Sequence, residues 1–184
     1  MALAAVPLPY GLRDVKIQKL SDDGTALVGG QIDLPYARTF SFAETEEFEE
    51  LRGDDTQVAT HGAGPIVEWE LESGGISFEA MSAMYGGTVT TTGVTPNLRK
   101  RWRKLTTDIR PYFRVEGQSI SDSGGDVHGI VYRCKATDNM EGEFSDGSFF
   151  LSSGSGQGMG NLIAGADLDS LYDFVQNETV TAIV

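Results

Sequence analysis

The residues that could perform catalysis or bind a metal are few and lie far apart in this chain. Its 184 residues include two histidines, His61 and His128, and one cysteine, Cys134. Zinc sites need several such ligands at short spacings, which these positions lack. A lone cysteine forms no internal disulfide, which fits folding in a reducing cytoplasm. We therefore predict no metal site, and we expect Cys134 to be a small core residue.

Sequence motifs for catalysis and cofactor binding are also missing. There is no Gly-x-Ser-x-Gly nucleophile elbow and no Gly-Lys-Ser/Thr phosphate loop. The glycine- and serine-rich run 152–160 lacks the dinucleotide-binding spacing, and we predict a mobile loop there. A glycosidase needs two carboxylates in different environments, and among 27 Asp and Glu a pair arises readily by chance. We predict that the protein is not an enzyme and binds no cofactor.

The overall charge and length narrow the class of protein. The formal net charge is −13, whereas affinity for a nucleic-acid backbone comes mainly from basic residues. We therefore expect no tight binding to DNA. No apolar run approaches the ~20 residues of a membrane span, and the first residues lack the basic region of a signal peptide. The length fits one domain over 1–184.

Acidic side chains gather in the segment 44–56, where seven of thirteen residues are Asp or Glu. Its two large apolar residues, Phe48 and Leu51, bury too little surface to hold a helix against this self-repulsion. We predict an extended, projecting loop at about 43–65. A solvated loop and a segment that meets a basic partner both fit this pattern.

Basic side chains gather around Trp102. Five of the fourteen Lys and Arg fall between Arg99 and Lys104. Three interpretations stay open: a nucleic-acid contact, a solvated edge strand, and an interface with an acidic partner. We favour the last, because acidic and basic segments at opposite ends of one chain would join copies head to tail. The candidate contact residues are Glu44, Glu46, Glu47, Glu49, Glu50, Arg99, Arg101, Arg103 and Lys104.

The stretch 64–87 reads as a strand, a glycine turn and a short helix. Apolar residues alternate with glutamates over 67–72, as in a strand with one buried and one solvated face. Ser77 can cap a helix over about 77–85, and Gly86 can end it. The glutamates on the solvated face are Glu68, Glu70 and Glu72.

Most of the remaining sequence is strand-like. Residues 1–10, with two prolines, predict an N-terminal arm outside the fold. A bulge is predicted at Gly129. These patterns together predict a mainly β domain with one short helix. The predicted strands are 12–20, 25–34, 38–42, 88–95, 112–115, 127–136, a hairpin over 140–151, and 178–184.

Several short pieces of the sequence follow one another in a distinctive order. They are Glu-Leu-Arg-Gly-Asp-Asp at 50–55, Val-Glu-Trp-Glu-Leu-Glu at 67–72, Gly-Gly-Ile-Ser-Phe-Glu at 74–79, Gly86-Gly87, Arg-Pro-Tyr-Phe at 110–113, Gly-Gly-Asp-Val-His at 124–128, Tyr-Arg-Cys-Lys-Ala at 132–136 and Leu-Tyr-Asp-Phe at 171–174. In this order, from about residue 10 to the end, the chain resembles the major tail tube protein of long-tailed, siphovirus-like bacteriophages.

This resemblance implies a β-sandwich or small barrel of two antiparallel sheets with one short flanking helix. It also implies hexameric rings stacked into a virion tail tube, assembled in the host bacterial cytoplasm, through which genomic DNA is ejected. The partners would be further copies of the chain and the tape measure and tail-terminator proteins, with no membrane. Carboxylates facing the bore would repel phosphate and let DNA slide; Glu68, Glu70 and Glu72 are our candidates. The loop at 43–65 and the terminal arms would bridge successive rings, and we expect 44–50 to meet 99–104 of another subunit.

Two other functions stay open. A type VI secretion-like tube protein would share the fold and the six-fold rings but serve secretion, and neighbouring genes would separate the two. A monomeric β-sandwich module that binds a ligand would form neither rings nor tubes.

Overall fold

The computed structural model describes residues 6–183 as a mainly β domain. Strand accounts for 53% of the chain and helix for 4%, so the predicted fold class is confirmed. Residues 1–5 of the predicted N-terminal arm, and residue 184, lie outside the described part. The elements are β1 (Pro9–Leu20), β2 (Leu27–Asp33), β3 (Ala37–Thr45), β4 (Phe48–Gly53), β5 (Thr56–Gly62), β6 (Ile66–Gly74), α1 (Phe78–Tyr85), β7 (Thr88–Thr92), β8 (Arg99–Arg103), β9 (Phe113–Ser121), β10 (Asp126–Ala136), β11 (Leu151–Met159) and β12 (Tyr172–Asn177).

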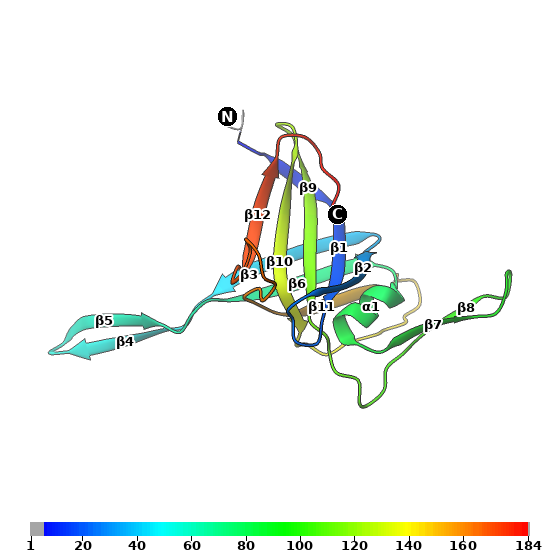
Figure 1. Cartoon of the computed structure of the whole chain (residues 1–184), viewed down its shortest axis with the longest axis horizontal. Helices are drawn as coiled ribbons and strands as arrows, with labels where there is room; N and C mark the ends of the chain where they lie inside the picture. Colours follow the sequence, from blue (N-terminus) through cyan, green and yellow to red (C-terminus); the bar gives the residue numbers. More distant parts are fainter. Residues whose placement is uncertain (1–5, 184) are drawn as a thin grey trace.

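One eight-stranded antiparallel sheet forms the body. Seven of its strands follow the order β2-β1-β9-β10-β11-β6-β3, and the eighth, β12, lies off this path and pairs with β10. On one of its edges, the long strand β10 pairs with two different strands. Its first half, Asp126–Val131, pairs with β12, and its end, Arg133–Ala136, pairs with β11. The register between β9 and β10 shifts between Val131 and Cys134, so the bulge predicted at Gly129 was placed too early. This change of partner lets the sheet fold over on itself into a sandwich or barrel-like shape (Figure 1).

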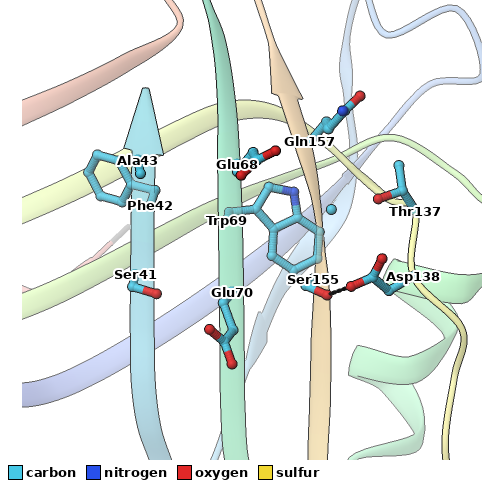
Figure 2. A pocket seen from close by; sticks show the side chains of 11 residues that line it. Ser41, Phe42, Ala43, Glu68, Trp69, Glu70, Thr137, Asp138, Ser155 and Gln157 are labelled. Carbon is cyan, nitrogen blue, oxygen red and sulfur yellow. Dashed lines mark hydrogen bonds between the residues drawn. The ribbon is translucent and has the colours of Figure 1, made fainter. Parts of the chain in front are cut away.

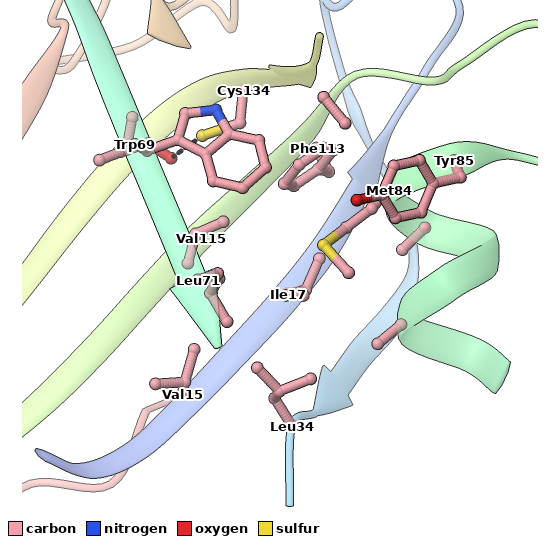
Figure 3. Packing of buried hydrophobic residues seen from close by; sticks show 14 of the residues in the cluster. Val15, Ile17, Leu34, Trp69, Leu71, Met84, Tyr85, Phe113, Val115 and Cys134 are labelled. Atoms are coloured by element: carbon pink, nitrogen blue, oxygen red, sulfur yellow. Dashed lines mark hydrogen bonds between the residues drawn. The ribbon is translucent and has the colours of Figure 1, made fainter. Parts of the chain in front are cut away.

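The core lies between the two halves of the folded sheet (Figure 3). Trp69 of β6 packs edge-on against Phe113 of β9, with ring centroids 5.3 Å apart. The alternation predicted for β6 is confirmed, because Val67, Trp69 and Leu71 are buried while Glu68 and Glu70 are exposed. Each large apolar side chain that is fully buried contributes about 1.5–3 kcal/mol, so this alternation alone fixes the face that β6 turns inward.

The predicted helix is α1, and its caps are those read from the sequence. The Ser77 hydroxyl accepts a hydrogen bond from the Ala80 N–H at 3.3 Å, which satisfies one donor of the first turn. Gly86 ends the helix at φ +80°, where an added Cβ would lie 2.5 Å from the Ile109 carbonyl oxygen. Residues 80–85 are all buried, so packing holds a helix too short to be stable alone.

Two paired glycines make room for aromatic side chains of β3. Gly117 of β9 pairs with Gly129 of β10, and together they leave a hollow that receives Phe40 and Phe42 of β3. A Cβ on Gly117 would lie 2.5 Å from Phe40 Cδ1. Phe42 also stacks on Phe174 of β12 at 5.2 Å. Side chains, rather than backbone pairing, therefore join β3 to β9, β10 and β12.

Four local predictions were wrong. The run 152–160 is not a mobile loop but most of β11, in the interior of the sheet. The hairpin predicted over 140–151 forms no strand before Leu151, and the strand predicted at 178–184 is absent over 178–183. Residues 9 and 10 do not belong to the predicted arm, because β1 already begins at Pro9 and pairs with Ser121.

Candidate assembly surfaces

The acidic segment forms a two-stranded hairpin that projects from the body (Figure 1). Strands β4 and β5 pair only with each other, so the segment predicted as an extended loop at about 43–65 is a paired hairpin over most of its length, and its first residues belong to β3. Every residue of β4 is exposed. The hairpin also presents apolar side chains to solvent, with Phe48, Leu51 and Val58 between 61% and 64% exposed.

The carboxylates of this hairpin differ in how far they are engaged. Glu50 pairs with Arg52 at 3.3 Å, and Glu44 accepts a hydrogen bond from the Tyr172 hydroxyl at 2.9 Å. Neither the Glu47 nor the Glu49 side chain forms a salt bridge or hydrogen bond within residues 6–183. Glu46, Asp54 and Asp55 likewise have no such partner among the described residues, but Glu46 is half-buried. Glu47 and Glu49 are therefore two of several carboxylates that are free to meet another molecule.

The basic segment forms a second projecting hairpin, β7–β8, whose two faces differ. Arg99, Arg101 and Arg103 alternate along β8 and are exposed. They form no salt bridge with any described residue. On the other face, Lys100 pairs with Glu79, and the Trp102 Nε1–H donates to the Gly86 carbonyl at 2.9 Å.

Lys104 belongs with this second, engaged face. Its ammonium donates to the carbonyl of Tyr85 at the end of α1, where a cation is favourable because the helix dipole is negative there. Lys104 thus anchors the hairpin to the body, and the free positive charge is carried by Arg99, Arg101 and Arg103.

The two hairpins leave the body on opposite sides. Figure 1 shows β4–β5 extending to one end of the long axis and β7–β8 to the other, with the sheet between them. The acidic and basic surfaces of one chain are therefore held apart.

The three candidate lumen-lining glutamates lie on the solvated face of β6. Glu68 and Glu70 line a polar groove of about 700 Å³ with Ser41, Asp138 and Gln157 (Figure 2). Glu72 pairs with Arg38 of β3 at 3.4 Å. Glu68 and Glu70 thus keep their charge unpaired within the part of the chain that the structure describes, and this face attracts cations and repels phosphate.

A polar cluster on the opposite half of the sheet was not predicted. Its members are buried although they are charged or polar: Glu116, Gln118, Asp126 and His128. The Nδ1 atom of His128 lies 2.8 Å from Glu116 Oε1, and its Nε2 atom lies 3.0 Å from Asp126 Oδ2. The one available signal was the period-two spacing of Asp126 and His128.

Burial raises the pKa of the Asp126 carboxyl, but hydrogen bonds from Gln118, Thr181, Asn177 and His128 outweigh it and lower the pKa to about 2. Burial lowers the pKa of His128, and its hydrogen bonds and charge attraction with Glu116 and Asp126 reverse this and raise it. Cys134 is fully buried, and burial raises the pKa of its thiol well above the usual range.

Within residues 6–183, no group of three or more His, Cys, Asp or Glu side chains is arranged to hold a metal ion. None of the described helices is long and apolar enough to cross a membrane. Comparison with protein-family models and with curated proteins finds no match to this chain.

Proposed function

We propose that this protein is a structural subunit that assembles with copies of itself, in six-fold rings stacked into a hollow tube, and that the tube is a phage-type tail conduit for DNA. One observation carries the proposal. Two hairpins of opposite charge project from opposite ends of one rigid β body.

Such an arrangement favours contact between chains over contact within one. Charges of opposite sign on one molecule cancel when they touch, and these are kept apart by the body. Identical copies can instead join acidic end to basic end, in a heterologous contact that generates rings or filaments. The free partners are Glu47 and Glu49 on one side and Arg99, Arg101 and Arg103 on the other.

The shape of the hairpins supports the same assembly. An isolated two-stranded hairpin is marginal in water, and β4–β5 leaves three large apolar side chains exposed. Contact with a second copy would cover Phe48, Leu51 and Val58 and would add apolar burial to the charge pairing.

The carboxylate face of β6 fits a conduit wall. A tube through which DNA slides must not bind phosphate, and Glu68 and Glu70 present unpaired negative charge on the solvated face of β6. The proposal places this face toward the bore.

Charge reversal tests the proposal. Arg101→Glu with Arg103→Glu should leave a folded monomer and abolish tubes in electron micrographs, because acid would face acid. Glu47→Arg with Glu49→Arg should fail in the same way.

The decisive variant carries all four changes. Complementarity is then restored with the signs exchanged, so tubes should return. Arg13→Glu, an exposed change remote from both hairpins, is the control for altered net charge. Normal tubes from the Arg101/Arg103 variant would overturn the charged contact. A wild-type chain that remains monomeric at high concentration would overturn the assembly itself and favour a monomeric binding module.

A further inference from the structure

The buried polar cluster holds down the end of the chain. Glu116 and Gln118 of β9 and Asp126 and His128 of β10 share the face of the sheet opposite Phe113 and Val115. Residues 178–183, here called the C-terminal segment, follow β12 and cross this face. The four polar side chains are at most 7% exposed.

The C-terminal segment is attached by side chains. The Thr181 N–H donates to Asp126 Oδ2 at 2.9 Å, and the Thr181 carbonyl accepts from Gln118 Nε2 at 2.9 Å. The Lys16 ammonium donates to the Ile183 carbonyl at 3.0 Å. Among the described residues, no hydrogen bond between two backbone groups joins this segment to the sheet. Its attachment therefore depends on a few polar groups.

His128 is at the centre of this attachment. Nδ1 faces the Glu116 carboxylate at 2.8 Å, while Nε2 faces both Asp126 Oδ2 at 3.0 Å and the Thr181 carbonyl at 3.1 Å. Every one of these neighbours is an acceptor. Both ring nitrogens must donate to satisfy them, which only the protonated imidazolium can do.

The strands packed around His128 carry both cations and carboxylates. On β9, Arg114 Nη2 lies 2.8 Å from Glu116 Oε2, so the Glu116 carboxylate contacts both Arg114 and His128. On β1, Lys16 lies opposite Glu116 in the register and 4.0 Å from Asp14. On β12, Asp173 accepts a hydrogen bond from Tyr132. The C-terminal segment faces His128 with the Thr181 carbonyl.

We propose that His128 is a proton-operated latch: its imidazolium fastens the C-terminal segment to the sheet, and loss of the proton frees the segment. A neutral ring would direct one nitrogen lone pair at a carboxylate or at the Thr181 carbonyl. That repulsion would act at the point where the C-terminal segment is attached, and it would weaken the attachment. The inference concerns the single chain and does not depend on ring assembly.

The pH window follows from the two shifts. His128 has a pKa raised above its ordinary 6.5 when the segment is docked, so its contribution is complete below 6.5 and is lost as pH rises through the raised pKa. Asp126 is shifted from 3.8 down to about 2, so its contribution is lost as pH falls through that range. Docking is therefore strongest between about pH 4 and 6.5.

Amide exchange at Thr181 reports the latch directly, because its N–H bonds to Asp126. We expect its NMR protection factor, corrected for intrinsic exchange, to fall as pH rises from 6.5 to the raised His128 pKa, by up to about tenfold per pH unit, the limit for one linked proton, and to level off above that pKa. Titration of the His128 ring signal should give a midpoint at the pH where the fall levels off. The Val131 amide, in the core, should stay protected.

Three variants sharpen the test. His128→Gln should give weak protection at Thr181 that does not change between pH 5 and 9. His61→Gln, at the exposed histidine of β5, should behave as wild type. Glu116→Gln should move the midpoint to lower pH, since it removes one charge that holds the proton. Constant protection at Thr181 in wild type across this range, or a fall that does not level off at the His128 ring midpoint, would overturn the latch.

Discussion

At the scale of single residues, glycines decide where other side chains can go. On β11, Gly154, Gly156 and Gly158 alternate on the buried face. A Cβ on Gly156 would overlap the carbonyl of Lys135, and one on Gly158 would lie 2.7 Å from a methyl group of Val131. The missing side chains let neighbouring strands and large core residues approach β11 closely.

Gly156→Ala should therefore destabilise the fold by about 1–3 kcal/mol, the usual cost of forcing extra volume into a packed core. Urea unfolding followed by tryptophan fluorescence measures this. Gly30→Ala is the matched control, because Gly30 also lies on a strand but has no atom within 4 Å of an added Cβ. Equal unfolding midpoints for the two variants would contradict the expectation.

At the scale of elements, the sequence predicted what is local and missed what depends on neighbours. Strand β6 and helix α1 were found because alternation and Ser77 capping are visible within one segment. Strand β11 was missed because its buried face is made of glycine, which gives no hydrophobic signal and usually marks a loop. The cluster around His128 depends on the register of β9 against β10, which one strand does not reveal.

The candidate site shows the same division. Alternation identified Glu68, Glu70 and Glu72 as solvent-facing, and charge density identified both projecting segments. The separation of Lys104 from the free arginines could not be predicted, because it depends on the carbonyl of Tyr85 lying beside the hairpin.

The β4–β5 hairpin should be removable without harm to the body. Its strands pair only with each other, and the Ala63 N–H donates to the Glu47 carbonyl at 2.9 Å, so the chain ends at its base are adjacent. Replacing 48–62 by Asn-Gly, a turn suited to joining antiparallel strands, should leave thermal unfolding of the body nearly unchanged while abolishing tubes.

A hairpin of full length with Glu46, Glu47, Glu49 and Glu50 changed to Gln is the matched control for its charge. It should assemble weakly if charge dominates the contact. A large loss of thermal stability on deletion would show instead that the hairpin supports the body.

At the scale of the whole molecule, the distribution of charge matters more than its sum. The chain carries −13 overall, yet three free arginines stand together at one end and free carboxylates at the other. Such a molecule is strongly dipolar, and its electrostatic attraction to copies of itself is directional.

Assembly should therefore weaken as salt is added. The Debye length falls from about 10 Å at 0.1 M to about 3 Å at 1 M, which screens exposed charges before they meet. Sedimentation velocity from 0.05 to 1 M NaCl should show a shift from polymer to monomer. If added salt left assembly unchanged or strengthened it, Phe48, Leu51 and Val58 would be its main source instead of the charges.

The slenderness of the projecting ribbons has a mechanical consequence. In a polymer whose subunits meet through two-stranded hairpins, each eight-stranded body would be stiff. The contacts between subunits would be the flexible parts. Bending would then be absorbed by slight splaying of the connectors on one side, while the width of the central opening, set by the rigid units, stays constant.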